Sequence, residues 1–111
     1  MAQRAYSDGV IYHLIERTEW ERAELHGVGV VLPDGEVFLH CCDEHQLRQV
    51  RAAYFPVHAD VVALTLDPTQ LAGETRYEPG SAGESERFPH LYGSIRTVEV
   101  VGVELVSLIQ T

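Results

Sequence analysis

Three histidines are the residues of this chain whose types and placement could do chemistry. His13 and His40 each stand inside an apolar, strand-like run, and His90 stands in the turn-rich segment Arg87–Gly93. Imidazole is polar and titrates near neutral pH, so an ordinary core strand has little use for it. We therefore expect a site assembled from separate segments of the chain. The alternatives are buried rings bonded to backbone, for His13 and His40, and a plain rigid turn, for His90.

Five strands and two helices are expected to position these residues. Val10–Ile15 reads as a buried strand carrying His13, and Val37–Cys41 as a second strand carrying His40. Asp60–Leu66 is apolar on both faces, which is typical of a central strand. The remaining strands are expected at Thr75–Glu78 and at Val98–Val106, where Gly102 predicts a bulge. The order of elements indicates an α+β fold with a mostly antiparallel sheet.

Capping signals place the two helices. Thr18–Glu21 has the form of a capping box, which predicts a helix from Thr18 to about His26 that ends at Gly27. Asp43 is expected to cap a second helix, Glu44–Phe55, before Pro56. Its predicted buried stripe is Leu47, Val50, Tyr54 and Phe55. Loops are expected at Gly27–Gly35 and Pro79–Glu86, and a short turn or helical turn at Pro68–Leu71.

Composition limits the classes of function. The 111 residues predict one domain, with residues 1–9 as a flexible N-terminal tail. Eight arginines, no lysine and seventeen acidic residues give a net charge of −9, which disfavours broad nucleic-acid binding. No apolar run approaches the roughly 20 residues of a membrane span, and no export signal follows the N-terminus. We expect no membrane association and a cytoplasmic protein, and the adjacent Cys41 and Cys42 fit a reducing compartment.

Several short segments together resemble a known family. They are Ile11–Leu14, Phe38–Cys41 followed by Asp43–Leu47, Arg76–Glu78 and Phe88–Gly93. In this order they resemble the bacterial family called domain of unknown function 952, from about Ile11 to Val103. Two departures are Cys42, where the family usually has Ser, and the Gly27–Gly35 loop. The resemblance implies an ADP-ribosyltransferase-like fold, with the sheet in two halves and two helices, closest to the RNA 2′-phosphotransferase branch.

That resemblance implies a site for NAD or a related ADP-ribosyl nucleotide between the sheet halves. His13 and His40 would match the two histidine positions of the branch, with His13 bonded to a ribose hydroxyl. Further nucleotide contacts would come from Tyr12, Arg76 and Gln46, with Arg87 as a second pyrophosphate partner. The third catalytic position falls among Glu78, His90 and Tyr92: Glu78 would polarise the ribose 2′-hydroxyl, and Tyr12 or Tyr92 would stack on nicotinamide.

Other interpretations stay open at this point. The chain could be a non-catalytic nucleotide-sensing or partner-binding module, or a metal hydrolase with His13, His40 and His90 as ligands. Glu78 could be a surface carboxylate paired with Arg76, and Gln46 could serve only as a cap beside Asp43. Cys42, just ahead of a helix, could be a nucleophile, although a small buried cysteine is far more common.

Overall fold

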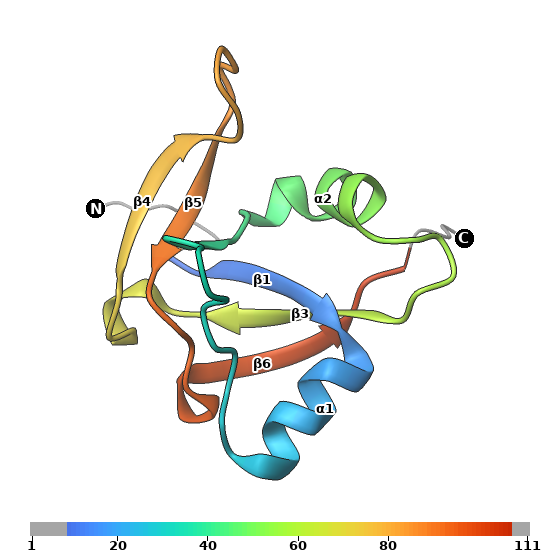
Figure 1. Cartoon of the computed structure of the whole chain (residues 1–111). Coiled ribbons are helices and arrows are strands. Elements are labelled where there is room, and N and C mark those ends of the chain that lie inside the picture. Colours follow the sequence, from blue (N-terminus) through green and yellow to red (C-terminus); the bar gives the residue numbers. More distant parts are fainter. Residues whose placement is uncertain (1–8, 108–111) are drawn as a thin grey trace.

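Two antiparallel three-stranded sheets and two helices make up the α+β architecture (Figure 1). The structure, a computed structural model, describes residues 9–107. The predicted tail, residues 1–9, therefore lies outside the described residues except for Gly9. The two helices are α1 (Arg17–His26) and α2 (Leu47–Tyr54). Short 3₁₀ segments occupy Glu44–Gln46, Pro68–Gln70 and Thr97–Glu99.

The first sheet has the order β1-β3-β6, formed by Ile11–Glu16, Val61–Leu66 and Val100–Leu105. The expectation that Asp60–Leu66 supplies a central strand is confirmed, because β3 pairs with both neighbours. The bulge predicted near Gly102 is also present. Thr65 pairs with Gly102 but Leu66 pairs with Val100, which leaves Val101 as the extra residue.

The second sheet has the order β2-β5-β4, formed by Leu39–His40, Arg87–Tyr92 and Glu74–Pro79. The turn predicted at Arg87–Gly93 is wrong, since most of this segment is the central strand β5. Pro89 misled the prediction because proline usually avoids central strands. Here its carbonyl oxygen accepts from Cys41 N at 3.1 Å, so its missing N–H faces the same side, where β2 has only two residues. The predicted strand Val37–Cys41 is correspondingly shorter.

The start of α1 also differs from the prediction. The strand β1 continues to Glu16, and the helix begins directly at Arg17 without a side-chain cap, so the capping box at Thr18 is not used. Arg17 N donates instead to the carbonyl oxygen of Asp60 at 2.8 Å. The end of the helix is as predicted, with Gly27 in the left-handed region at φ 67°.

The buried side of α2 corrects another expectation. Leu47, Val50 and Phe55 pack partly buried against the core, but Tyr54 is 75% exposed. Arg51 is buried in its place, 2% exposed, because carbonyl oxygens of the following loop surround its guanidinium. A hydrophobic period cannot reveal a buried arginine.

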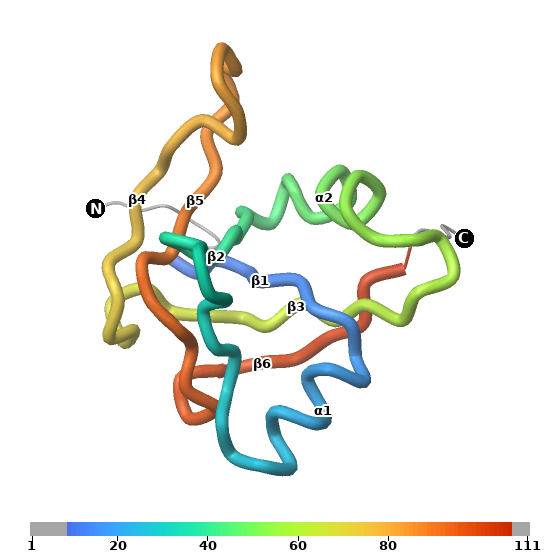
Figure 2. Tube along the Cα trace, in the orientation of Figure 1, coloured from blue at the N-terminus to red at the C-terminus, as the bar shows by residue number. Residues whose placement is uncertain are grey.

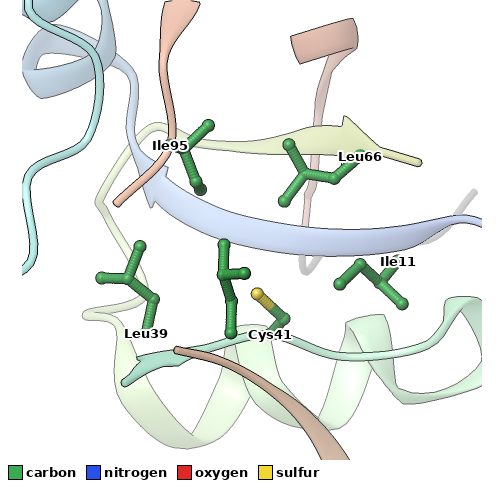
Figure 3. Close-up of a cluster of buried hydrophobic side chains, with 6 residues drawn as sticks. Ile11, Leu39, Cys41, Leu66 and Ile95 are labelled. Carbon is green, nitrogen blue, oxygen red and sulfur yellow. The ribbon is translucent and has the colours of Figure 1, made fainter. Parts of the chain in front are cut away.

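The core lies on both faces of the first sheet. Trp20 and Ala23 of α1 pack on one face against Ile15, Val62 and Leu64. The helix α2 packs on the opposite face of this sheet, against Leu14 and Ala63. A third cluster joins the two sheets (Figure 3) and consists of Ile11, Leu39, Cys41, Leu66, Leu91 and Ile95.

The seam between the sheets positions the site. Tyr12 and Cys42 form an isolated bridge, with N–H···O bonds of 2.8 Å in both directions. The chain from Phe38 to Cys42 thus runs beside the free edge of β1 at one point (Figure 2). Among residues 9–107, neither helix has the length and apolar character needed to cross a bilayer.

Candidate functional site

A cleft of about 620 Å³ lies along this seam. Residues of β1 line one side, residues 38–42 line another, and His90 of β5 contributes to the wall. His13, His40 and His90 therefore reach one cleft from three different strands. Tyr12 lines it as well. The volume falls within the roughly 300–1,000 Å³ typical of small-molecule sites.

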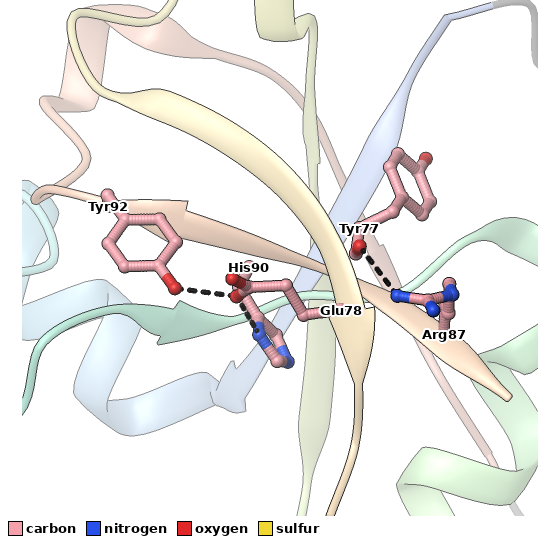
Figure 4. Close-up of polar contacts among 5 residues, drawn as sticks. All are labelled: Tyr77, Glu78, Arg87, His90 and Tyr92. Carbon is pink, nitrogen blue, oxygen red and sulfur yellow. Dashed lines mark hydrogen bonds and ion pairs between the residues drawn. The ribbon is translucent and has the colours of Figure 1, made fainter. Parts of the chain in front are cut away.

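Glu78 organises the polar group beside the cleft (Figure 4). Its Oε1 accepts a hydrogen bond from the Tyr92 hydroxyl at 2.6 Å and contacts His90 Nδ1 at 2.8 Å. The strand register explains the meeting, because Arg76 pairs with His90 and Glu78 pairs with Phe88, so these side chains share one face of the sheet. The three candidates for the third catalytic position form one hydrogen-bonded cluster.

The charge of Glu78 determines the tautomer of His90. Hydrogen bonds from Tyr92 and then from His90 hold the pKa of the Glu78 carboxyl below its ordinary value, although desolvation opposes them. An ionised carboxylate only accepts hydrogen bonds. Nδ1 of His90 must therefore carry a proton, and in the neutral ring Nε2 is an acceptor. The hydrogen bond that the Tyr92 hydroxyl donates to Glu78 raises the pKa of Tyr92.

Phe38 is a site residue that the sequence analysis missed. Its ring stacks on His90 with centroids 3.9 Å apart and planes 10° apart, and it meets His40 edge-on at 5.0 Å. It also lies 5.3 Å from the Tyr92 ring and lines the cleft. The available signal was alternation along the predicted strand Val37–Cys41, in which Phe38 stands two residues before His40 and shares its face.

His13 spans the seam. Its Nδ1 donates to the carbonyl oxygen of His40 at 2.8 Å. The backbone bond foreseen in the alternative interpretation is thus present, and the same residue lines the cleft. Burial lowers the pKa of His13, which keeps the ring neutral near pH 7. Desolvation and the neighbouring His90 also lower the pKa of His40, against a smaller opposing effect of Glu36.

Gln46 is held entirely by protein groups. Its Oε1 accepts from Asp43 N at 2.8 Å, and its Nε2 donates to the carbonyl oxygen of Arg87 at 2.9 Å and to Glu86 Oε2 at 3.1 Å. Gln46 is 1% exposed and is not among the described residues that line the cleft. It caps its helix and fixes the start of β5.

The two arginines expected at a pyrophosphate lie outside the lining of the cleft. Arg76 is bonded to Glu74 at 3.0 Å, so it does not form the ion pair with Glu78 that the surface interpretation required. Its guanidinium lies 4.5 Å from the centre of the Tyr92 ring. Arg87 donates to the carbonyl oxygen of Tyr77 at 3.5 Å, and strand alternation points it away from the face of His90 (Figure 4).

The cysteines and the metal hypothesis gain no support from the geometry. Burial raises the pKa of Cys42 to about 12, and Cys41 is shifted in the same direction. A thiol that stays protonated is a poor nucleophile. Within residues 9–107, no group of three or more His, Cys, Asp or Glu side chains is arranged to hold a metal ion.

The fold and the site define an α+β protein with a histidine-lined cleft between two antiparallel sheets. The chain belongs to the family described as Protein of unknown function (DUF952), which matches residues 14–103. No curated protein matches the chain.

Solved structures of one protein share the fold. The crystal structure of CC0527 from Caulobacter crescentus is 28% identical, with 86% of this chain and 84% of that chain covered and a TM-score of 0.69. The solution NMR structure of CC0527 is 26% identical over 89% of this chain and 85% of that chain, with a TM-score of 0.72. Both structures are of the same structural-genomics target, and their names describe no activity.

Proposed function

We propose that the cleft binds NAD or a related ADP-ribosyl nucleotide, in an ADP-ribosyltransferase-like fold that can transfer the ADP-ribosyl group. The observation that carries this proposal is the convergence of His13, His40 and His90, from three strands, on one cleft between two sheet halves. The order and spacing of the family motifs support it. The ligand we propose is a small molecule rather than a nucleic acid, since the chain has a net charge of −9.

The side chains suggest a division of labour. His13 would contact a ribose hydroxyl, and His40, at the exposed side of the cleft, would contact the nucleotide beside it. In the transfer, the bond from ribose C1″ to the nicotinamide nitrogen breaks, nicotinamide leaves with the bonding pair, and an acceptor oxygen forms the new bond. His90 Nε2 would take the proton of that acceptor, with the ring held by Glu78, which itself accepts a hydrogen bond from Tyr92.

One observation favours a second candidate, a module that binds the nucleotide without turning it over. Oε1 of Glu78 is already engaged by Tyr92 and His90. A carboxylate held in this way is less available to polarise a ribose hydroxyl. For either function we propose the cytoplasm, because both cysteines are free thiols, which is typical of a reducing compartment.

Calorimetric titration of NAD tests the proposal. We expect saturable binding to the wild-type protein and at least a tenfold loss in His13→Ala, because that variant removes a cleft side chain. His26→Ala is the matched control, since His26 is exposed at the end of α1. Equal binding by His13→Ala and His26→Ala, or no binding to the wild type, would rule the nucleotide cleft out.

Glu78→Ala separates the two candidates. Loss of nicotinamide release with retained NAD binding supports transfer. A wild-type protein that binds NAD and releases no nicotinamide with any acceptor supports the binding module.

A further inference from the structure

The nitrogen that the proposed transfer would use is closed off in this structure. His90 is 2% exposed, and its Nε2 is buried with no hydrogen-bond partner among the described residues. Phe38 lies flat on one face of the imidazole, with ring centroids 3.9 Å apart and planes 10° apart. Both residues line the cleft. A ligand in the cleft therefore cannot reach Nε2 unless a covering side chain moves, and Phe38 is the one that lies flat over the ring.

The segment that carries Phe38 is held at its two ends. Before it, Leu32 N donates to Ser94 Oγ at 2.8 Å, and after it, Leu39 is buried in the core. All of its residues ahead of Phe38 are exposed. Within the part of the chain that the structure describes, no hydrogen bond or ion pair ties residues 33–38 to the rest of the protein. The segment can therefore move between its anchors at the cost of the Phe38 ring contacts.

Two opposing effects act on Phe38 in this position. Burial of its apolar surface and the stacking of its ring favour the contact with His90. The contact is opposed by the state of Nε2, which is an acceptor in the neutral ring because Nδ1 donates to Glu78. A buried acceptor without a partner costs free energy, and water would relieve that cost if Phe38 moved away. Because the two effects are of the same order, we expect a second position of Phe38 to be populated.

We infer that Phe38, carried by residues 33–38, is a lid that closes His90 off from the cleft and swings away to open Nε2 to a ligand. In the closed position the lid keeps water from the base. A ligand that contacts Nε2 binds only the open position and therefore shifts the population toward it. The movement is a property of the chain alone. Its use in ADP-ribosyl transfer rests on the proposed function, where it would expose the base only when a ligand is bound.

Chemical modification of His90 measures the opening. Diethyl pyrocarbonate transfers an ethoxyformyl group to an accessible neutral imidazole nitrogen, and mass spectrometry after trypsin digestion locates it. His90 is the one histidine of the tryptic peptide 88–96, and the exposed His58 is the one histidine of the peptide 52–76. At pH 8 we expect His90 to react about 10- to 1,000-fold more slowly than His58, which corresponds to an open population of about 0.1–10%. Cys42, in a parallel sample with iodoacetamide, should stay unmodified and so report that the chain is folded.

Two variants and one control assign the opening to Phe38. Phe38→Ala removes the covering ring and should raise the rate at His90, relative to His58, about fivefold or more. Phe38→Leu keeps an apolar side chain but cannot stack, and its rate should lie between those of the wild type and Phe38→Ala. Val37→Ala is the matched control, because Val37 is the neighbouring residue and is 67% exposed. It should leave the rate at His90 within about twofold, and thermal unfolding shows whether each variant is folded.

The outcomes decide the lid without reference to a nucleotide. Modification of His90 while Cys42 stays unmodified, with a faster rate in Phe38→Ala, supports the lid. Modification of His90 only where Cys42 is alkylated as well shows that His90 opens by unfolding of the whole chain, and it overturns the lid even if no variant folds. Equal rates in Phe38→Ala and Val37→Ala overturn it too. Since NAD is absent from these reactions, the calorimetric titration of NAD tests the proposed function separately, and either proposal can fail alone.

Discussion

The carboxylate of Glu78 holds the imidazole of His90 through a 2.8 Å contact between Oε1 and Nδ1. The two residues are twelve apart in sequence and meet because β4 and β5 are antiparallel neighbours. The contact fixes which ring nitrogen carries the proton, and in the neutral ring it leaves Nε2 as the acceptor.

Replacing Glu78 with Leu should move the ring proton of His90. In the wild type we expect the Nδ1–H tautomer, and in Glu78→Leu the proton should shift toward Nε2, since the acceptor at Nδ1 is gone. Nitrogen-15 chemical shifts of the ring report the tautomer. Glu74→Leu, on the same strand, is the control. An Nε2–H tautomer in the wild type would contradict the assignment.

Acidification should destabilise the protein through His13. Its pKa in the folded state is lowered from 6.5, so the unfolded chain binds the proton more readily. The stability from the neutral ring is fully present above pH 6.5 and is lost as the pH falls below that value. Urea unfolding at several pH values from 7.5 to 5 measures how steeply the free energy of unfolding falls with pH. This slope should be shallower in His13→Asn, whose amide can still donate to the carbonyl oxygen of His40. His26→Asn is the control, and an unchanged slope in His13→Asn would refute the assignment.

Arg51→Leu should lower the free energy of unfolding by about 3 kcal/mol, because buried acceptors lose their donor. Arg51 is 2% exposed, and its guanidinium donates to carbonyl oxygens of Val106, Pro56 and Ala59 at 3.2, 3.2 and 2.8 Å. Chemical denaturation measures the change. Arg22→Leu, exposed on α1, should stay within about 0.5 kcal/mol of the wild type. Similar losses in the two variants would argue against a structural role for Arg51.

Gly29 should tolerate a side chain far less well than Gly27. Both have positive φ, 71° and 67°, so Ala costs about 1–2 kcal/mol of backbone strain at either position. A Cβ at Gly29 would also overlap the carbonyl oxygen of Ile95, whereas nothing lies within 4 Å at Gly27. We expect Gly29→Ala to cost at least about 2 kcal/mol more than Gly27→Ala. Equal unfolding midpoints would show that this loop is not clamped against Ile95.

The thiols should resist alkylation in the folded protein. Burial raises the pKa of Cys42 to about 12, so little thiolate is present at pH 8. Mass spectrometry after iodoacetamide treatment should find both cysteines unmodified until urea unfolds the chain. Rapid native labelling of Cys42 would revive its interpretation as a nucleophile.

Local signals in the sequence predicted much of the fold correctly. The apolar run of β3, the stop at Gly27 and the bulge near Gly102 all depend on neighbours within a few residues. The strand β5 escaped prediction because the consequence of Pro89 depends on what lies beside it. Only the pairing with a two-residue β2 leaves room for a proline in a central strand.

The chain by itself determined which residue types stand at the cleft. His13 and His40 had to lie in strands, because the surrounding apolar residues form strands wherever they pack, and His90 was singled out by its chemistry alone. The tertiary structure decided the partners: Phe38 on His90, Glu78 on its Nδ1, and the arginines outside the lining. Strand register brings together residues that are distant in sequence, and the packing of both sheets sets that register.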